Sequence, residues 1–178
     1  MRPALRLPHA LTALLLASTV GSSWGQLSAE AVKAGLVFNF VKFAEWPAAV
    51  LPPGAPLHLC TVGPRDPTIA ALDALQDKIA QGHAVSLRAT TPREGFKGCH
   101  VVAVSAGLNP PLVDTVRQAH AAGALTVSDA PGFTEAGGIV GFFAEGDHIR
   151  FDINLDSTYK ADVRISLQVL RLARNVRK

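Results

Sequence analysis

Apolar residues recur along the chain in two spacings, one helical and one extended. Between residues 29 and 46 the spacing is helical, with Ser28 before it as a candidate N-cap and Pro47 after it, so we predict one helix there. Short apolar runs typical of strands occupy 57–62, 84–88, 99–104 and 125–127. The chain therefore predicts a sheet that follows an N-terminal amphipathic helix.

Two more predicted helices separate these strands, and a hairpin follows them. One helix begins at Asp66-Pro67 and runs to about residue 75, and one opens at Asn109-Pro110 and closes at Gly123. A loop rich in glycine and proline covers 128–138. The last predicted elements are a β-hairpin over 139–144 and 148–154, then a helix over 163–176. This order predicts an α/β fold: a three-layer sandwich with a mixed sheet and a C-terminal hairpin plus helix.

Residues 1–25 have the plan of a secretory signal peptide. Arg2 and Arg6 give a positive start, an uncharged apolar run covers residues 10–20, and Ser23 and Gly25 place small residues before a cut at Gln26. The apolar run is too short to span a bilayer. We expect cleavage, export to the periplasm and a mature chain of residues 26–178 that forms one domain.

Composition and charge narrow the class of protein. The chain has 178 residues, 48% hydrophobic and 17% charged, which fits one globular domain and excludes a disordered tail. The net charge of +3 falls to +1 when residues 1–25 leave, because they hold two arginines and no acid. Without a basic surplus we expect no nucleic-acid partner, and no later apolar run predicts membrane insertion.

Export changes the interpretation of the two cysteines. Cys60 and Cys99 lack a Cys-x-x-Cys spacing, and an oxidising compartment favours a structural disulfide over a redox pair or half of a metal site. Both lie in strand-like segments, so two buried thiols that never meet remain the alternative.

Motifs that would indicate an enzyme are absent from the sequence. It contains no nucleophile elbow, Walker loop, dinucleotide-binding glycine motif or zinc-binding helix, so we predict no catalytic residues, cofactor or metal. The histidines are scattered singly. His58 and His100 would come close if their two strands were neighbours, which makes a metal site between them testable but not expected.

Polar residues near strand ends and on the hairpin are candidates for ligand binding. Ligands of open α/β sheets gather beyond the carboxyl ends of parallel strands, where Asp129 lies. In strand 148–154 the polar His148, Arg150 and Asp152 alternate with apolar residues, so one face is core and one is wet. Turn formation by Asp129 and an outer strand kept soluble by charge are the simpler alternatives.

The helix over 29–46 carries the candidate partner-binding residues. When its residues are placed at 100° steps, Phe38 and Trp46 flank Lys42 on the side opposite the apolar half. Aromatic side chains there indicate either cover by another part of the fold or an exposed anchor for a partner. Lys33 falls inside the apolar half, and its first-turn position predicts a route to solvent.

Several segments together resemble the YfiR family of periplasmic regulators. They are Lys33–Pro47, Gly98–Val102, Leu125–Asp129 with Gly132-Phe133 and Gly137-Gly138, Arg150–Asn154 and Arg164–Ala173. The likeness covers nearly all of the mature chain. One departure is Asp162, where the family usually has a glycine before its last helix. A second cysteine pair of some members is absent.

The resemblance implies a Rossmann-like sandwich without enzymatic activity. Family members bind the periplasmic domain of an inner-membrane diguanylate cyclase and hold it inactive, which lowers cyclic di-GMP and biofilm formation. An OmpA-like outer-membrane lipoprotein can sequester the repressor, and dimers form. The resemblance also supports pairing Cys60 with Cys99. The alternative function is a periplasmic small-molecule sensor that uses Asp129 or the Arg150 face, and an enzyme is the weakest hypothesis.

Overall fold

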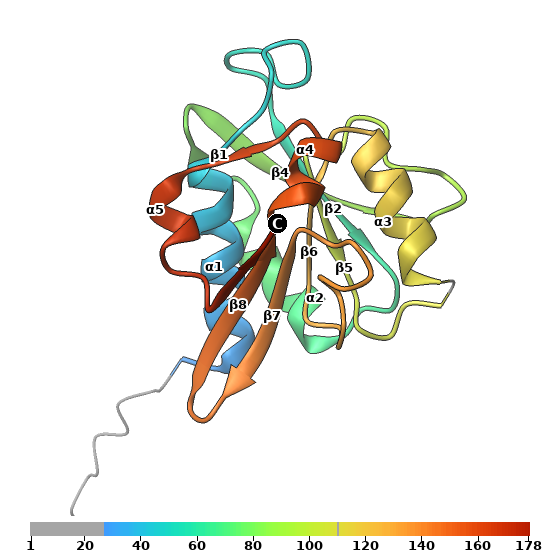
Figure 1. The fold of residues 1–178 in the computed structure, drawn as a ribbon. Coiled ribbons are helices and arrows are strands. Elements are labelled where there is room, and N and C mark those ends of the chain that lie inside the picture. The colour runs from blue at the N-terminus through green and yellow to red at the C-terminus, as the bar shows by residue number, and fades with distance from the viewer. Residues whose placement is uncertain (1–26, 110) are drawn as a thin grey trace, which may run out of the picture.

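Strand β2 lies inside the sheet on which the fold is built. A computed structural model describes residues 27–109 and 111–178, and the predicted signal peptide lies outside these residues (Figure 1). The elements in chain order are α1 Ala29–Phe43, β1 Ala44–Glu45, β2 Leu57–Val62, α2 Pro67–Ala71, the 3-10 helix Leu72–Leu75, β3 Ile79–Ala80, β4 His83–Thr90, β5 Val101–Val104, α3 Leu112–Ala121, β6 Leu125–Ser128, β7 Val140–Glu145, β8 His148–Asn154, α4 Leu155–Lys160, β9 Arg164–Ile165, α5 Leu167–Leu170 and β10 Asn175–Arg177.

The sheet is mixed, as predicted. Its strand order is β10-β8-β7-β6-β5-β2-β4-β3. The run from β4 to β7 is parallel, whereas β8 is antiparallel to β7 in the predicted hairpin and β3 is antiparallel to β4. A separate two-stranded pair joins β1 to β9.

Alternate residues of each inner strand supply two separate cores. Leu57, Leu59, Val101 and Ala103 face the layer of α1 and α2, and Val102 packs with α3 on the other face. Figure 1 shows α1 and α3 on opposite sides of the sheet. The three-layer α/β fold predicted from the sequence is therefore confirmed. Within the described residues, no helix is both long and apolar enough to cross a bilayer.

Helices α1 and α2 begin where the N-cap residues in the sequence predicted. The Ser28 hydroxyl accepts a hydrogen bond from the Ala31 N–H, and Asp66 accepts one from the Ile69 N–H, so both predicted N-caps are confirmed. Helix α1 ends at Phe43 instead of residue 46, because Ala44 pairs with Ile165 across β1 and β9. Helix α3 begins at Leu112, later than the predicted opening.

The predicted helix over 163–176 was wrong. This segment forms β9, the four-residue α5 and β10, which adds a parallel strand beside β8. Pairing with β1 and β8 supplies hydrogen-bond partners to the backbone groups at the edges of these two strands. The stabilisation from this pairing outweighs the local helical preference of the segment. Asp162, at φ 51°, turns the chain out of α4, as expected for a position where the family has glycine.

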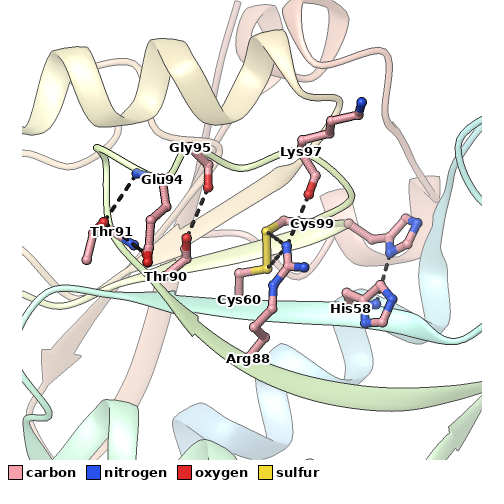
Figure 2. The surroundings of a disulfide bond; sticks show 10 residues. His58, Cys60, Arg88, Thr90, Thr91, Glu94, Gly95, Lys97 and Cys99 are labelled. Carbon is pink, nitrogen blue, oxygen red and sulfur yellow. Dashed lines mark hydrogen bonds between the residues drawn. A yellow bond between two sulfur atoms is a disulfide. The ribbon is translucent and has the colours of Figure 1, made fainter.

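The predicted disulfide between Cys60 and Cys99 is present and fully buried. Its Cα atoms are 5.7 Å apart, and it ties β2 to the turn that precedes β5. Figure 2 shows the Arg88 guanidinium against both sulfurs, 3.2 Å from Cys99 Sγ and 3.6 Å from Cys60 Sγ. The same guanidinium donates a hydrogen bond to the Lys97 carbonyl at 3.1 Å.

Removal of the disulfide is expected to destabilise the protein strongly. Cys60→Ala combined with Cys99→Ala should lower the free energy of unfolding by about 4 kcal/mol, because the unfolded chain regains the entropy of an open loop. Urea unfolding followed by circular dichroism measures the loss. Dithiothreitol should destabilise the wild type and leave the double variant unchanged. A double variant as stable as the oxidised wild type would contradict this prediction.

Candidate functional site

Two of the three predicted partner-binding residues, Phe38 and Lys42, form one surface on α1. They lie one helical turn apart, and Lys42 Nζ is 5.9 Å from the centre of the Phe38 ring. Lys78 Nζ approaches the same ring to 5.5 Å. Phe38 is half-buried, so its ring packs partly on the core and remains flanked by two ammonium groups.

The third residue, Trp46, lies past the end of α1 in different surroundings. Its ring meets the His100 ring edge-on with centroids 6.3 Å apart, and it lines a small hollow with Leu51, Leu57 and His83. Its indole Nε1 is buried without a hydrogen-bond partner among the described residues. Trp46 is therefore half-buried against another part of the fold, one of the two arrangements that the helical wheel left open.

His100 is held by the protein through both ring nitrogens. Nδ1 accepts a hydrogen bond from the His58 N–H at 2.9 Å, and Nε2 lies 3.1 Å from the Val50 carbonyl. The two histidine rings do stack, at 5.8 Å, as neighbouring strands allow. Burial lowers the pKa of His100, and nearby His58 and His83 lower it further, against the hydrogen bond to Val50. The described residues contain no cluster of three metal-ligating side chains.

An exposed apolar groove between α4 and α5 was missed by the sequence analysis. We call it the α4–α5 groove; it has a volume of about 510 Å³ and is lined by Leu155, Tyr159, Val163, Ile165, Leu167 and Leu170 among others. Tyr159 is 74% exposed and Leu167 is 69% exposed, and Leu172 beyond α5 is 70% exposed. Soluble proteins rarely gather large apolar side chains at the surface without a partner.

The α4–α5 groove adjoins the end of α1. The Ser166 N–H donates to the Phe43 carbonyl at 3.0 Å, directly beside Leu167. Phe43 is 36% exposed, and Lys42 Nζ lies 5.9 Å from its ring centre. Figure 1 shows α1 and α5 side by side. Lys42 thus lies near both the Phe38 ring and the Phe43 ring, and Phe43 adjoins the segment that opens the α4–α5 groove.

The predicted ligand-binding residues divide between two grooves. Asp129 and Asp152 line one groove of about 430 Å³ together with Lys33 and Arg174. Its charges are paired: Lys33 Nζ lies 2.6 Å from Asp129 Oδ2, and Arg174 binds both oxygens of Asp152 at 3.1 and 2.6 Å. The first-turn position of Lys33 predicted a route to solvent. The structure instead places its ammonium group on the Asp129 carboxylate.

His148 and Arg150 lie at the tip of the hairpin, in a second groove. That groove is lined by Val32 of α1 and by Ile149 as well. Arg150 Nε is 3.4 Å from Glu145 across the hairpin. The alternation of β8 is confirmed, since Phe151 and Ile153 are buried. Ligand binding by these residues stays a prediction.

Asp129 is held ionised by its neighbours. Burial disfavours its charge, but hydrogen bonds from Lys33 and Thr68 and the charge of Lys33 outweigh that effect, so the pKa of Asp129 lies below its ordinary value. The Thr68 hydroxyl donates at 2.7 Å. Oδ1 is buried without a partner among the described residues. The cluster joins α1, α2 and the end of β6.

Asp129→Asn is expected to lower the free energy of unfolding by about 2–3 kcal/mol at neutral pH, because Lys33 loses a charged hydrogen bond where water is scarce. A lowered pKa stabilises the fold above the ordinary value of 3.8, and this contribution is lost as the pH falls through the lower folded value. The difference between variant and wild type should therefore stay constant from neutral pH down to about pH 5 and shrink below pH 3.8.

Urea unfolding across this pH range measures that difference. Asp114→Asn is the matched control, because Asp114 pairs with Arg117 at an exposed site and such pairs contribute little. An Asp129→Asn variant that unfolds like the wild type at neutral pH would refute the structural role of the cluster.

Comparisons with known proteins place the chain in a family. Residues 30–174 match the model of the YfiR/HmsC-like family. No curated protein matches the chain. A solved structure of similar fold is a conserved domain protein from Vibrio cholerae O1 biovar El Tor strain N16961, with 11% identity and a TM-score of 0.52. The similarity covers 85% of this chain and 61% of the Vibrio chain, so this chain spans less than two thirds of that protein.

The solved structure supports the fold alone at this level of identity. The family match covers most of the chain, including α1, the disulfide and the α4–α5 groove. The chain therefore belongs to the YfiR/HmsC-like family, a family of periplasmic regulators of diguanylate cyclase signalling.

Proposed function

We propose that this protein is a non-enzymatic periplasmic regulator, exported by cleavage of residues 1–25. It binds the periplasmic domain of an inner-membrane diguanylate cyclase and represses the enzyme, which lowers cyclic di-GMP and biofilm formation. Family membership supports the signalling role. The observation that carries the binding role is the α4–α5 groove with its exposed Tyr159 and Leu167.

The α4–α5 groove has the character of a docking surface. Burial of an exposed leucine side chain contributes about 1.5–3 kcal/mol to association, and aromatic residues such as tyrosine are enriched among the residues that dominate binding energy. Tyr159 is such an aromatic residue on one wall of the groove, Leu167 offers apolar area on the other wall, and Leu172 extends the apolar surface past α5. A partner that inserts an apolar side chain between α4 and α5 would bury all of these walls.

Charges at the margin specify what the partner presents. Lys42 lies beside Phe43 at the α1 side, and Arg164 and Asp162 line the groove itself. The exposed Glu45 is the partner of Arg164 across β1 and β9, so the margin carries charges of both signs. A partner with an apolar anchor flanked by charges of both signs, with a carboxylate against Lys42, is complementary to this pattern, and rim charges of this kind speed association and orient the complex. We assign this role to the cyclase domain.

One docking surface also accounts for release from repression. If an OmpA-like lipoprotein or a second copy of this chain occupies the same groove, the cyclase is displaced, because two partners cannot bury Leu167 at once. Sequestration and homodimer formation then compete with cyclase binding by mass action.

Leu167→Glu is expected to abolish repression while the protein stays folded, because the side chain is 69% exposed. The charge would be buried unpaired in the complex. Cross-linked capture from the native envelope measures binding, and a cyclic di-GMP reporter measures repression. The wild type should capture a membrane diguanylate cyclase, and the variant should lose it and raise the reporter signal.

Leu27→Glu is the matched control, because this leucine is 77% exposed and lies outside the α4–α5 groove. It should behave as the wild type in both measurements. Failure of the wild type to capture any diguanylate cyclase would overturn the proposed function. Capture unaffected by Leu167→Glu would overturn the proposed surface.

The candidate residues of α1 are expected to separate into two classes. Phe38→Ala with Lys42→Ala should weaken cyclase capture, because Lys42 lies near both the Phe38 and Phe43 rings and Phe43 adjoins the groove. Trp46→Ala should instead lower the free energy of unfolding, by about 2 kcal/mol for a half-buried ring, and leave capture intact. Thermal unfolding and cross-linked capture distinguish the two classes. Loss of capture in a stably folded Trp46→Ala protein would place Trp46 in the interface.

A further inference from the structure

A second hollow, on the far side of α4, combines apolar walls with unneutralised positive charge. We call it the α3–α4 groove; it has a volume of about 480 Å³. Its apolar part includes Val113 and Val116 of α3, and Val113 is 55% exposed. Arg117, His120 and Lys160 also line it. Figure 1 shows α3 and α4 side by side.

The hydrogen bonds of His120 define which ring nitrogen carries the proton. Thr126 Oγ1 accepts from the Ile139 N–H at 2.9 Å and lies 3.1 Å from His120 Nε2. The buried threonine hydroxyl has no other acceptor within the described residues, so it donates to Nε2. The proton of the neutral ring is then on Nδ1, which has no hydrogen-bond partner among these residues.

His120 is a neutral donor at ordinary pH. Burial, and to a smaller extent the charge of Lys160, lower its pKa to about 4. His120 and Lys160 both line the groove. The groove therefore offers an N–H donor beside a cation, and an anion bound there would be stabilised by both.

The two cations of the groove differ in their partners. Arg117 pairs with Asp114 at 2.8 Å on the exposed face of α3. Lys160 makes no ion pair with the described residues. Positive charge thus exceeds negative charge beside an apolar wall, whereas every cation of the Asp129 groove is already paired.

We propose that the α3–α4 groove binds a small amphipathic carboxylate. The apolar body of the ligand lies on Val113 and Val116, and its carboxylate accepts hydrogen bonds from Lys160, Arg117 and His120 Nδ1–H. The groove volume lies within the range of small-molecule sites, which are mostly apolar with a few convergent polar groups. The site does not depend on the proposed repressor function.

The test titrates the isotope-labelled mature protein with 4-phenylbutyrate and with its neutral amide, followed by nuclear magnetic resonance. The acid should give saturable shifts confined to α3, α4 and the 136–137 loop. The amide has the same shape without the charge, so it should bind roughly tenfold more weakly. The His120 Nδ1–H signal should move with the acid alone.

Lys160→Met keeps the apolar stem and removes the charge. It should weaken binding of 4-phenylbutyrate roughly tenfold and leave binding of the amide unchanged. Lys97→Met changes another exposed lysine, in the loop before Cys99, and should bind as the wild type. Absence of saturable shifts, equal binding of acid and amide, or shifts centred on the α4–α5 groove or the Asp129 groove would overturn the proposal. Each result is independent of whether the protein captures a cyclase.

Discussion

The parallel pairing of β2 with β4 on one side and β5 on the other is the constraint on which the structure depends. Leu59 pairs with Leu87 and Val101, and this register sends every second residue of three strands to the same layer. A slip by one residue would exchange the two cores. The buried disulfide fixes that register covalently, because it joins Cys60 in β2 to the turn that begins β5. The register thereby determines which residues pack against α1 on one face of the sheet and against α3 on the other.

The proposed docking surface depends on a smaller pairing at the margin of the fold. Ala44 and Glu45 leave the helical conformation to pair with Arg164 and Ile165, and the Ser166 N–H then reaches the Phe43 carbonyl. These bonds bring a segment more than a hundred residues away in sequence against the end of α1. Leu167 begins the short helix α5 directly after this pairing, and its side chain is 69% exposed there.

Sequence reasoning succeeded where local signals and burial agree. The strand 57–62 is apolar on both faces and bounded by turn residues, so its limits were predicted to the residue, and the N-caps at Ser28 and Asp66 followed from side-chain chemistry. The prediction of a helix over 163–176 failed because the conformation of this segment is determined by pairing with β1 and β8, which are distant in sequence. The α4–α5 groove, which this segment helps to form, could not be predicted for the same reason. Ser166 was a usable signal only for the start of α5, which it caps. Likewise nothing in the sequence placed Lys33 on Asp129.

Helix α4 lies between the two grooves that we assign to a partner and to a ligand. Ser157 and Lys160 face the α3–α4 groove, and Leu155 and Tyr159 face the α4–α5 groove. The helix is six residues long and is held by Asn154, which caps it and donates to the Thr134 carbonyl. A carboxylate ligand can change partner affinity only if it favours one position of α4 over another, and the partner must then favour the ligand by the same factor. Because α4 has only six residues, a shift of its backbone toward a ligand at Lys160 would also move Tyr159, one residue away.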